Sequence, residues 1–288
     1  MKKANIIILA GQSNAVGVGH TRCLSKHFDA DKIKEYYDGY ENVLINYYSH
    51  DKKSEGFVKT TVNCTEKSKD TLGPEVGIAE KLSRAYPGEE IFIVKCAFGG
   101  TSLYRDWLSP SGLGTAFGEY DSGAYASQKD DIIAALGTGE LIRAGWCYNE
   151  LVKLLSQSIE NLKNNGYAPA IRAFCWMQGE NDSCAQEFVD TYESRYVSLL
   201  CDLHASFGEY FDNCVYIDGG ISEEWMLYHG INESKKAHAE KYENSFYIDT
   251  IAHGLTTKNE PFEEPDTYHY DSDSTLKLGW LFAEHIKL

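Results

Sequence analysis

Five residues in this sequence carry groups that could together hydrolyse an ester: Ser13, Gly100, Asn181, Asp266 and His269. A serine hydroxyl becomes a nucleophile when a base removes its proton, and a histidine acts as that base when a carboxylate orients its ring. Asp266 stands three residues before His269, so in a turn its carboxylate can reach Nδ1 while Nε2 faces a serine. A glycine N–H and an asparagine amide supply donors for the oxyanion that forms in acyl transfer.

Ser13 follows an apolar stretch, residues 4–10, that ends at Gly11. An unbroken apolar run with β-branched residues is typical of a strand buried on both faces of a parallel sheet. Such sheets bind ligands beyond the carboxyl ends of their strands, and Gly11 allows the sharp turn that would present the serine there. The turn alone leaves three roles open for Ser13: a nucleophile, a phosphate-binding hydroxyl or the N-cap of a helix.

The apolar pattern predicts the elements that would position these residues. Further strands are expected at residues 43–48, 91–97, 170–177, 213–219 and 246–249, and helices from residue 73 and at 141–164, 185–206, 233–241 and 272–286. Glu75 is expected to be a charge near the positive end of the helix that begins at residue 73. Strands alternating with helices predict one α/β domain over residues 1–288, a three-layer α/β/α sandwich with a central parallel sheet of about five strands.

Three segments fall outside this pattern. Residues 15–42 are polar and turn-rich, and residues 49–70 are charged and indicate a surface loop. Residues 104–139 are rich in glycine, serine and tyrosine and predict an irregular insertion, either a substrate wall or a mobile surface segment. The Gly99–Gly100 pair fits either a close approach to a ligand or a plain tight turn.

The charge balance restricts the partners of the protein. There are 27 Lys and Arg against 43 Asp and Glu, a formal charge of -16 that repels nucleic acid and anionic membranes. No segment approaches the roughly 20 apolar residues of a membrane span. We therefore expect a small-molecule or oligosaccharide substrate, no nucleic-acid partner and no membrane partner, while the oligomeric state stays open.

The cysteines and the first residues bear on location. Eight cysteines are scattered without a Cys-x-x-Cys pair, so we expect neither structural zinc nor a disulfide framework. Buried free thiols are typical of a reducing compartment. The positively charged residues 1–3 precede an apolar run that is cut short for a signal peptide, so we expect a cytoplasmic protein.

Four sequence blocks stand in a fixed order along nearly the whole chain: GQSN at residues 11–14, GGTSL at 99–103, WMQGEND at 176–182 and DTYH at 266–269. These blocks resemble those of the SGNH-hydrolase superfamily, in its branch of sialate O-acetylesterase-like and acetylxylan-esterase-like carbohydrate esterases. The GPE motif at residues 73–75 also has a counterpart there. The resemblance implies an SGNH-hydrolase, flavodoxin-like fold.

The resemblance also implies roles for single residues. Ser13 would be the nucleophile, His269 the general base and acid, and Asp266 the residue that orients His269. The oxyanion hole would be formed by the Ser13 N–H, the Gly100 N–H and the Asn181 side chain. Gln178 is a rival or additional donor, because the place of Asn181 is often a serine in this branch.

The resemblance implies neither a cofactor nor a metal. Gln12, Trp107 and Gln178 are the expected substrate contacts. Tyr104 and Trp176 are further aromatic candidates for stacking on a sugar, although buried aromatic side chains more commonly belong to the core.

The predicted function is removal of O-acetyl groups from a carbohydrate, such as acetyl-xylan or sialic acid, through an acyl-serine intermediate. Three alternatives stay open: a non-catalytic sugar-binding protein, a lipase or thioesterase, and a metal-dependent phosphoesterase suggested by Asp249, His253, Asp266 and His269. His253 is also a rival base because it lies near Asp249. The other histidines, His50 among them, are expected at the surface or in packing.

Overall fold

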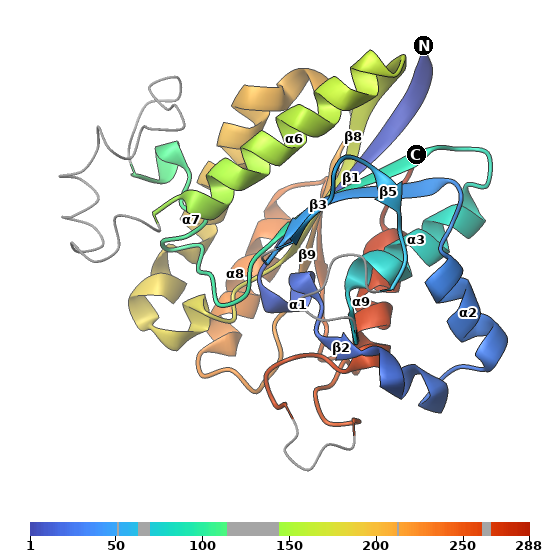
Figure 1. Cartoon of the computed structure of the whole chain (residues 1–288). Helices are drawn as coiled ribbons and strands as arrows, with labels where there is room; N and C mark the ends of the chain where they lie inside the picture. Colours follow the sequence, from blue (N-terminus) through green and yellow to red (C-terminus); the bar gives the residue numbers. More distant parts are fainter. Residues whose placement is uncertain (51, 63–69, 114–143, 212, 261–265) are drawn as a thin grey trace.

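The computed structural model describes residues 1–50, 52–62, 70–113, 144–211, 213–260 and 266–288 (Figure 1). Its main sheet has eight strands, in the order β10-β9-β8-β1-β7-β3-β4, with β5 also paired to β3. The strands are β1 (Lys2–Gly11), β3 (Val43–Ser49), β4 (Lys52–Lys53), β5 (Val58–Lys59), β7 (Ile91–Ala97), β8 (Tyr167–Met177), β9 (Val215–Gly219) and β10 (Ser245–Ile248). All neighbouring pairs from β10 to β3 are parallel, and the short β4 and β5 are antiparallel to β3.

The predicted parallel sheet is therefore confirmed, and β10 matches the strand expected at residues 246–249. In chain order the parallel strands lie 2-3-1-4-5-6 across the sheet. The flavodoxin order is 2-1-3-4-5, so in this chain the first and third strands exchange places. The strand β1 stays central, between β7 and β8, and its carboxyl end opens at the middle of the sheet edge.

Two helices pack closely together on one face of the sheet. They are α3 (Pro74–Ala85) and α9 (Ser272–Glu284), which lie side by side in Figure 1. Glycines let their backbones touch: a methyl group on Gly77 would lie 2.2 Å from the carbonyl oxygen of Leu276, and one on Gly279 would lie 2.1 Å from a carbonyl oxygen of α3. This face is anchored to the sheet by Lys95 of β7, which contacts α3.

The opposite face is covered by α6 (Trp146–Asn164) and α7 (Gln186–Phe207). Asn46 of β3 donates a hydrogen bond to Ser158 of α6 at 2.8 Å. Trp176 of β8 stacks on Tyr196 of α7, with ring centroids 5.9 Å apart. Side chains of a strand alternate between its faces, and by strand register Asn46 and Trp176 share a face that Lys95 does not. The three predicted layers are confirmed.

Several smaller elements complete the described chain. They are α1 (Ser13–Val16), β2 (Gly19–His20) paired with β6 (Thr71–Leu72), α2 (Ala30–Asp38), α8 (Tyr228–Lys241), and 3₁₀ turns at Thr21–Lys26, Pro110–Leu113, Asp182–Cys184 and Gly208–Tyr210. Residues 15–42, which the sequence indicated to be turn-rich, also contain α2, a helix that was not predicted. Asp29 caps it by accepting a hydrogen bond from the Lys32 N–H. Helix α8 begins before the expected residue 233.

Most of the expected insertion at residues 104–139 lies outside the described residues, as does the start of the helix expected from residue 141. Residues 104–113 form turns and one 3₁₀ turn against α7. All cysteines of the described residues are free thiols. None of the described helices combines the length and the apolar character needed to cross a bilayer.

Candidate active site

Ser13 lies at the carboxyl end of β1, where the backbone turns abruptly. Gly11 has φ +143°, and a methyl group there would lie 1.9 Å from the carbonyl oxygen of Met177, so only glycine fits. The next N–H, that of Gln12, donates to the same oxygen at 2.9 Å. Ser13 is then the first residue of α1, and Gln12 occupies the cap position. The Ser13 side chain makes no hydrogen bond with a described residue, so the N-cap alternative does not describe this serine.

Asp266 and His269 form a pair in one turn. The Asp266 Oδ2 lies 2.6 Å from the His269 Nδ1, as the spacing predicts, and Oδ1 accepts the N–H groups of Tyr268 and His269. Burial raises the pKa of Asp266, but these hydrogen bonds and the His269 charge outweigh burial, and the pKa lies below its ordinary value. Asp266 is therefore an ionised acceptor for Nδ1, which directs the Nε2 of His269 away from the pair.

One amide ties the serine turn to the histidine segment. The Asn14 Oδ1 accepts the Tyr270 N–H at 3.0 Å, and the Asn14 Nδ2 donates to Glu180 Oε1 at 2.7 Å. Asn14, Glu180 and Tyr270 are all buried. The residues next to Ser13 and His269 are thus joined directly, while no hydrogen bond within the described chain links the Ser13 Oγ to His269. Catalytic hydrogen bonds are often long before substrate binds.

Gly100 and Asn181 meet at the mouth of the site, each from a loop beside β1. The Asn181 Nδ2 donates to the Gly100 carbonyl at 3.4 Å, and the Asn181 N–H donates to Gln12 Oε1 at 3.1 Å. Gly100 has φ +69° and open space around its Cα. Both residues keep solvent access. Besides the Ser13 N–H, three oxyanion donors were predicted, and two of them, Gly100 and Asn181, therefore lie together.

Gln178 lies elsewhere, fully buried below this mouth. Its Nε2 faces three acceptors, Gln12 Oε1 at 3.3 Å, the Thr101 carbonyl at 3.1 Å and Asp182 Oδ2 at 2.5 Å. Gln12 is also buried, with 1% of its surface exposed. The expectation that Gln12 and Gln178 contact substrate is therefore corrected: their amides are used to hold the loops together.

Asp182 is a residue of the candidate site that the sequence predictions did not include. Its carboxylate accepts the N–H groups of Leu103 and Tyr104, at 2.8 and 2.9 Å, and so ties the glycine block to the loop after β8. Burial raises the pKa of Asp182 to about 6, although these hydrogen bonds oppose the shift. The signal in the sequence was an acidic residue directly after Asn181, in the loop that also contains Gln178.

The aromatic candidates for sugar stacking belong to the core. Trp107 is fully buried, packs edge-on against Trp176 at 5.1 Å between centroids, and donates its Nε1 hydrogen to Thr101. Tyr104 stacks on Phe188 at 4.1 Å. The expectation that Trp107 contacts substrate is wrong, because its ring has no exposed face.

A buried ion pair contacts the last residue of α1. The Lys95 Nζ lies 2.6 Å from Glu75 Oε2 and donates to the Val16 carbonyl at 2.7 Å, and both charged side chains are almost completely buried. Glu75 is in the first turn of α3, as predicted, so it interacts with Lys95 as well as with the positive end of the helix. The signal was a lysine within the apolar strand β7, because a buried charge needs a partner.

The rival residues lie in another turn. The Asp249 Oδ1 accepts the Ala252 N–H, and the His253 N–H bonds the Asp249 carbonyl, in the turn after β10. Within the described ranges, no group of three His, Cys, Asp or Glu side chains is spaced to hold a metal ion.

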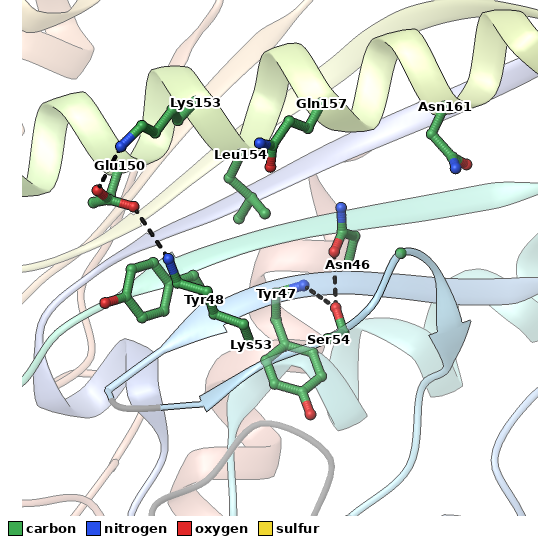
Figure 2. Close-up of a pocket in the computed structure, with 11 residues that line it drawn as sticks. Asn46, Tyr47, Tyr48, Lys53, Ser54, Glu150, Lys153, Leu154, Gln157 and Asn161 are labelled. Atoms are coloured by element: carbon green, nitrogen blue, oxygen red, sulfur yellow. Dashed lines mark hydrogen bonds and ion pairs between the residues drawn. The ribbon is translucent and has the colours of Figure 1, made fainter. Parts of the chain in front are cut away.

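A cavity of about 380 Å³ lies away from these residues, between β3, β4 and α6 (Figure 2). Asn46 and Tyr48 line it from β3, and Gln157 and Asn161 point into it from α6. None of its lining residues belongs to the loops that carry Ser13, Gly100, Asn181 or His269. The candidate active site is therefore an open edge of the sheet and is separate from this cavity.

A family model described as carbohydrate esterase, sialic acid-specific acetylesterase, matches residues 3–287. The chain belongs to this family. The carbohydrate esterase is thus a carboxylic ester hydrolase that acts on a small-molecule or oligosaccharide substrate, and the predicted family is confirmed. A comparison with curated proteins finds no match to the carbohydrate esterase.

Three solved structures share the fold of this carbohydrate esterase. A protein from Arabidopsis thaliana is 18% identical with a TM-score of 0.61, covering 97% of this chain and 96% of its own. NanS is 15% identical with a TM-score of 0.60, covering 98% and 95%. XAC1771 from Xanthomonas citri, described as a novel carbohydrate acetylesterase, is 12% identical with a TM-score of 0.58, covering 98% of this chain and 55% of its own.

Proposed function

We propose that this carbohydrate esterase removes O-acetyl groups from a sugar through an acetyl-serine intermediate. The observation that carries the proposal is the Asp266–His269 contact at 2.6 Å, tied through Asn14 to the turn that presents Ser13. A carboxylate on Nδ1 is the arrangement in which a histidine acts as base toward a serine. The description of XAC1771 as an acetylesterase supports the acetyl group as the acyl part.

In the proposed reaction the Nε2 of His269 takes the Ser13 proton while Oγ attacks the ester carbonyl carbon. The carbonyl oxygen becomes an oxyanion and the imidazole becomes an imidazolium, which Asp266 stabilises. The C–O bond to the sugar then breaks, and His269 returns the proton to the departing sugar hydroxyl. Water then attacks the acetyl-serine while His269 takes one of its protons. The bond between the carbonyl carbon and Ser13 Oγ breaks, His269 returns the proton to Oγ, and acetate leaves.

The oxyanion would be held by the N–H groups of Ser13 and Gly100 and by the Asn181 side chain. Asn181 is favoured over Gln178 because its amide lies at the exposed mouth beside Gly100, whereas the Gln178 amide faces three buried acceptors. Fixed donors at a developing charge lower the barrier without reorganisation.

The first experiment replaces the nucleophile. Ser13→Ala should abolish hydrolysis of p-nitrophenyl acetate, because no other group would form the acyl-enzyme. A fluorophosphonate probe should label the wild-type protein and leave the variant unlabelled. Ser25→Ala, at an exposed serine in the turn at residues 21–26, is the matched control and should keep full activity and labelling. Undiminished turnover in Ser13→Ala would contradict the serine mechanism.

A second experiment identifies the substrate class. Acetate release is measured from acetylated sialic acids, acetylated xylo-oligosaccharides and simple acetyl-sugars, with long-chain p-nitrophenyl esters for comparison. Preference for an acetylated sugar is the expected result. Binding of the sugar without acetate release would indicate a binding protein, and preference for long acyl chains would indicate a lipase.

A further inference from the structure

His50 lies at the same sheet edge as Ser13, although the sequence indicated only a surface or packing role. It directly follows β3, which runs parallel to β7. Its N–H donates to the carbonyl of Ala97, the last residue of β7, at 3.0 Å. Because Gly99 comes two residues after Ala97, this bond sets His50 beside the glycine loop that would form part of the oxyanion hole.

The backbone of His50 is in the left-handed region, with φ +55°. Among the described residues other than glycine, only Asn213 shares a positive φ. Such conformations are sparsely populated, and they cluster where a side chain is aimed at a functional site. The turn at His50 therefore sets the direction of its ring.

The ring faces the nucleophile across Gly99. A methyl group on Gly99 would lie 3.1 Å from His50 Cε1, 3.3 Å from His50 Nε2 and 3.8 Å from Ser13 Cβ. The Nε2 edge of the imidazole and the Cβ of the serine thus border one small space, which the absence of a side chain at Gly99 keeps open. This space is next to the hydroxyl that would attack the ester.

Aromatic packing holds the chain on both sides of this space. Phe98 packs edge-on against Tyr48 at 4.8 Å between ring centroids, and it packs at a tilt against Trp146 at 4.4 Å. The Tyr48 ring also lies 3.7 Å from the Lys53 ammonium, at one end of the cavity in Figure 2. Since Tyr48 and Phe98 are close in sequence to His50 and Gly99, this packing helps to position both of these residues.

We propose that His50 is a substrate-binding residue whose Nε2 hydrogen-bonds the sugar part of the ester substrate bound at Ser13. The inference rests on the proposed function, because it requires the ester to be centred on the Ser13 hydroxyl. An ester centred on the Ser13 hydroxyl would lie next to the space at Gly99 that the His50 Nε2 borders. An imidazole nitrogen can donate to or accept from a sugar hydroxyl. His50 thereby contributes to selection of the alcohol part, while Asp266 and His269 carry the proton transfer.

The test separates recognition of the sugar from the chemistry. His50→Asn is the chosen variant, because asparagine tolerates the left-handed backbone but its short amide does not extend as far as the imidazole. We compare kcat/KM for an O-acetylated sugar with kcat/KM for p-nitrophenyl acetate, whose leaving group offers no sugar hydroxyl. The expected result is a fall of about tenfold on the sugar ester, mostly through KM, with p-nitrophenyl acetate changed less than about twofold.

Two controls make the result interpretable. His27→Ala, at an exposed histidine that follows the 3₁₀ turn at residues 21–26, should leave both rates unchanged. Fluorophosphonate labelling of Ser13 should stay at the wild-type rate in His50→Asn. An equal fall on both substrates, or no fall on either, would overturn the role of His50. Absence of labelling in the wild-type protein would instead contradict the proposed serine mechanism.

Discussion

Gln178 and Asn181 carry amides of similar chemistry and stand three residues apart, but they differ in how deeply their side chains are buried. Gln178 is completely enclosed and faces acceptors on three chain segments, while Asn181 keeps its amide at the surface next to Gly100. A buried amide that loses its acceptors pays the full desolvation cost, so Gln178 is held in place. This difference in environment supports Asn181, rather than Gln178, as the proposed oxyanion donor.

We therefore predict that Asn181→Ala lowers kcat by about 10²- to 10³-fold, the usual effect of removing one oxyanion donor. KM should change little, because the charge that Asn181 stabilises develops after substrate binds. The measurement is steady-state kinetics on p-nitrophenyl acetate, with the melting temperature of the variant as control. An Asn181→Ala enzyme with wild-type kcat would rule out this residue as a donor.

Local spacing made part of the site predictable. Asp266 reaches the Nδ1 of His269 within one turn, so the pair follows from three residues of separation. The roles of Gln12 and Trp107 could not be read in this way, because their burial depends on loops far away in the chain. His50 was missed because nothing in the sequence next to it indicates that β3 lies beside β7.

At the scale of the element, the contact between α3 and α9 depends on glycine. Gly77 and Gly279 each face a carbonyl oxygen of the other helix at a distance that leaves no room for a methyl group. Helix α9 follows the Asp266–His269 turn directly, and α3 carries Glu75, which pairs with Lys95 below α1. The close packing of these helices therefore helps to place both the proposed base, His269, and the proposed nucleophile, Ser13.

Gly77→Ala should destabilise the protein by about 1–3 kcal/mol, because the helices must separate to admit the methyl group. In an open helical position the same change is stabilising or neutral. Gly208→Ala is such a control, since a methyl group there meets nothing within 4 Å and the backbone is right-handed. Urea unfolding of the three proteins gives the comparison. Equal free energies of unfolding for Gly77→Ala and wild type would show that the contact is not tight.

The elements themselves were largely predictable and their arrangement was not. Apolar runs identified the parallel strands, most clearly β1 and β7, which are buried on both faces. Helix α2 was missed because it buries only Tyr36 and is otherwise polar. The exchange of the first and third strands relative to flavodoxin could not be predicted, because periodicity carries no information on which strands pair.

At the scale of the whole molecule, a net charge of -16 coexists with carboxylates that are fully enclosed. Burial raises the pKa of Asp182 to about 6 and raises that of Glu180 as well. Near pH 5 the folded protein therefore keeps a proton on Asp182 that the unfolded chain has lost. Since the folded state binds more protons, this carboxyl makes the fold less stable as pH rises from about 4 to 6.

We predict that Asp182 contributes a decrease of roughly 1.4 kcal/mol per pH unit in the free energy of unfolding over that window. Asp266 contributes to the pH dependence of stability with the opposite sign, because its pKa is lowered in the folded protein. It stabilises the fold at pH values above the ordinary pKa of an aspartate, and this stabilisation is lost as the pH falls through the lowered pKa. Urea unfolding between pH 4.5 and 6.5 should show a flatter pH dependence in Asp182→Asn than in the exposed control Asp31→Asn. Identical pH dependence in the two variants would contradict the raised pKa.

The bonds of Asn14 also determine when the site can exist. Its side chain holds Glu180, 166 residues later, and the backbone of Tyr270, 256 residues later. Closing loops of this length is slow and contributes late to folding. On the proposed mechanism, a chain that has formed β1 and its serine turn is still inactive, because the proposed base, His269, reaches its place only when the last of these loops has closed. Esterase activity is therefore a reporter of completed folding, and its recovery during refolding should lag behind the return of helical signal.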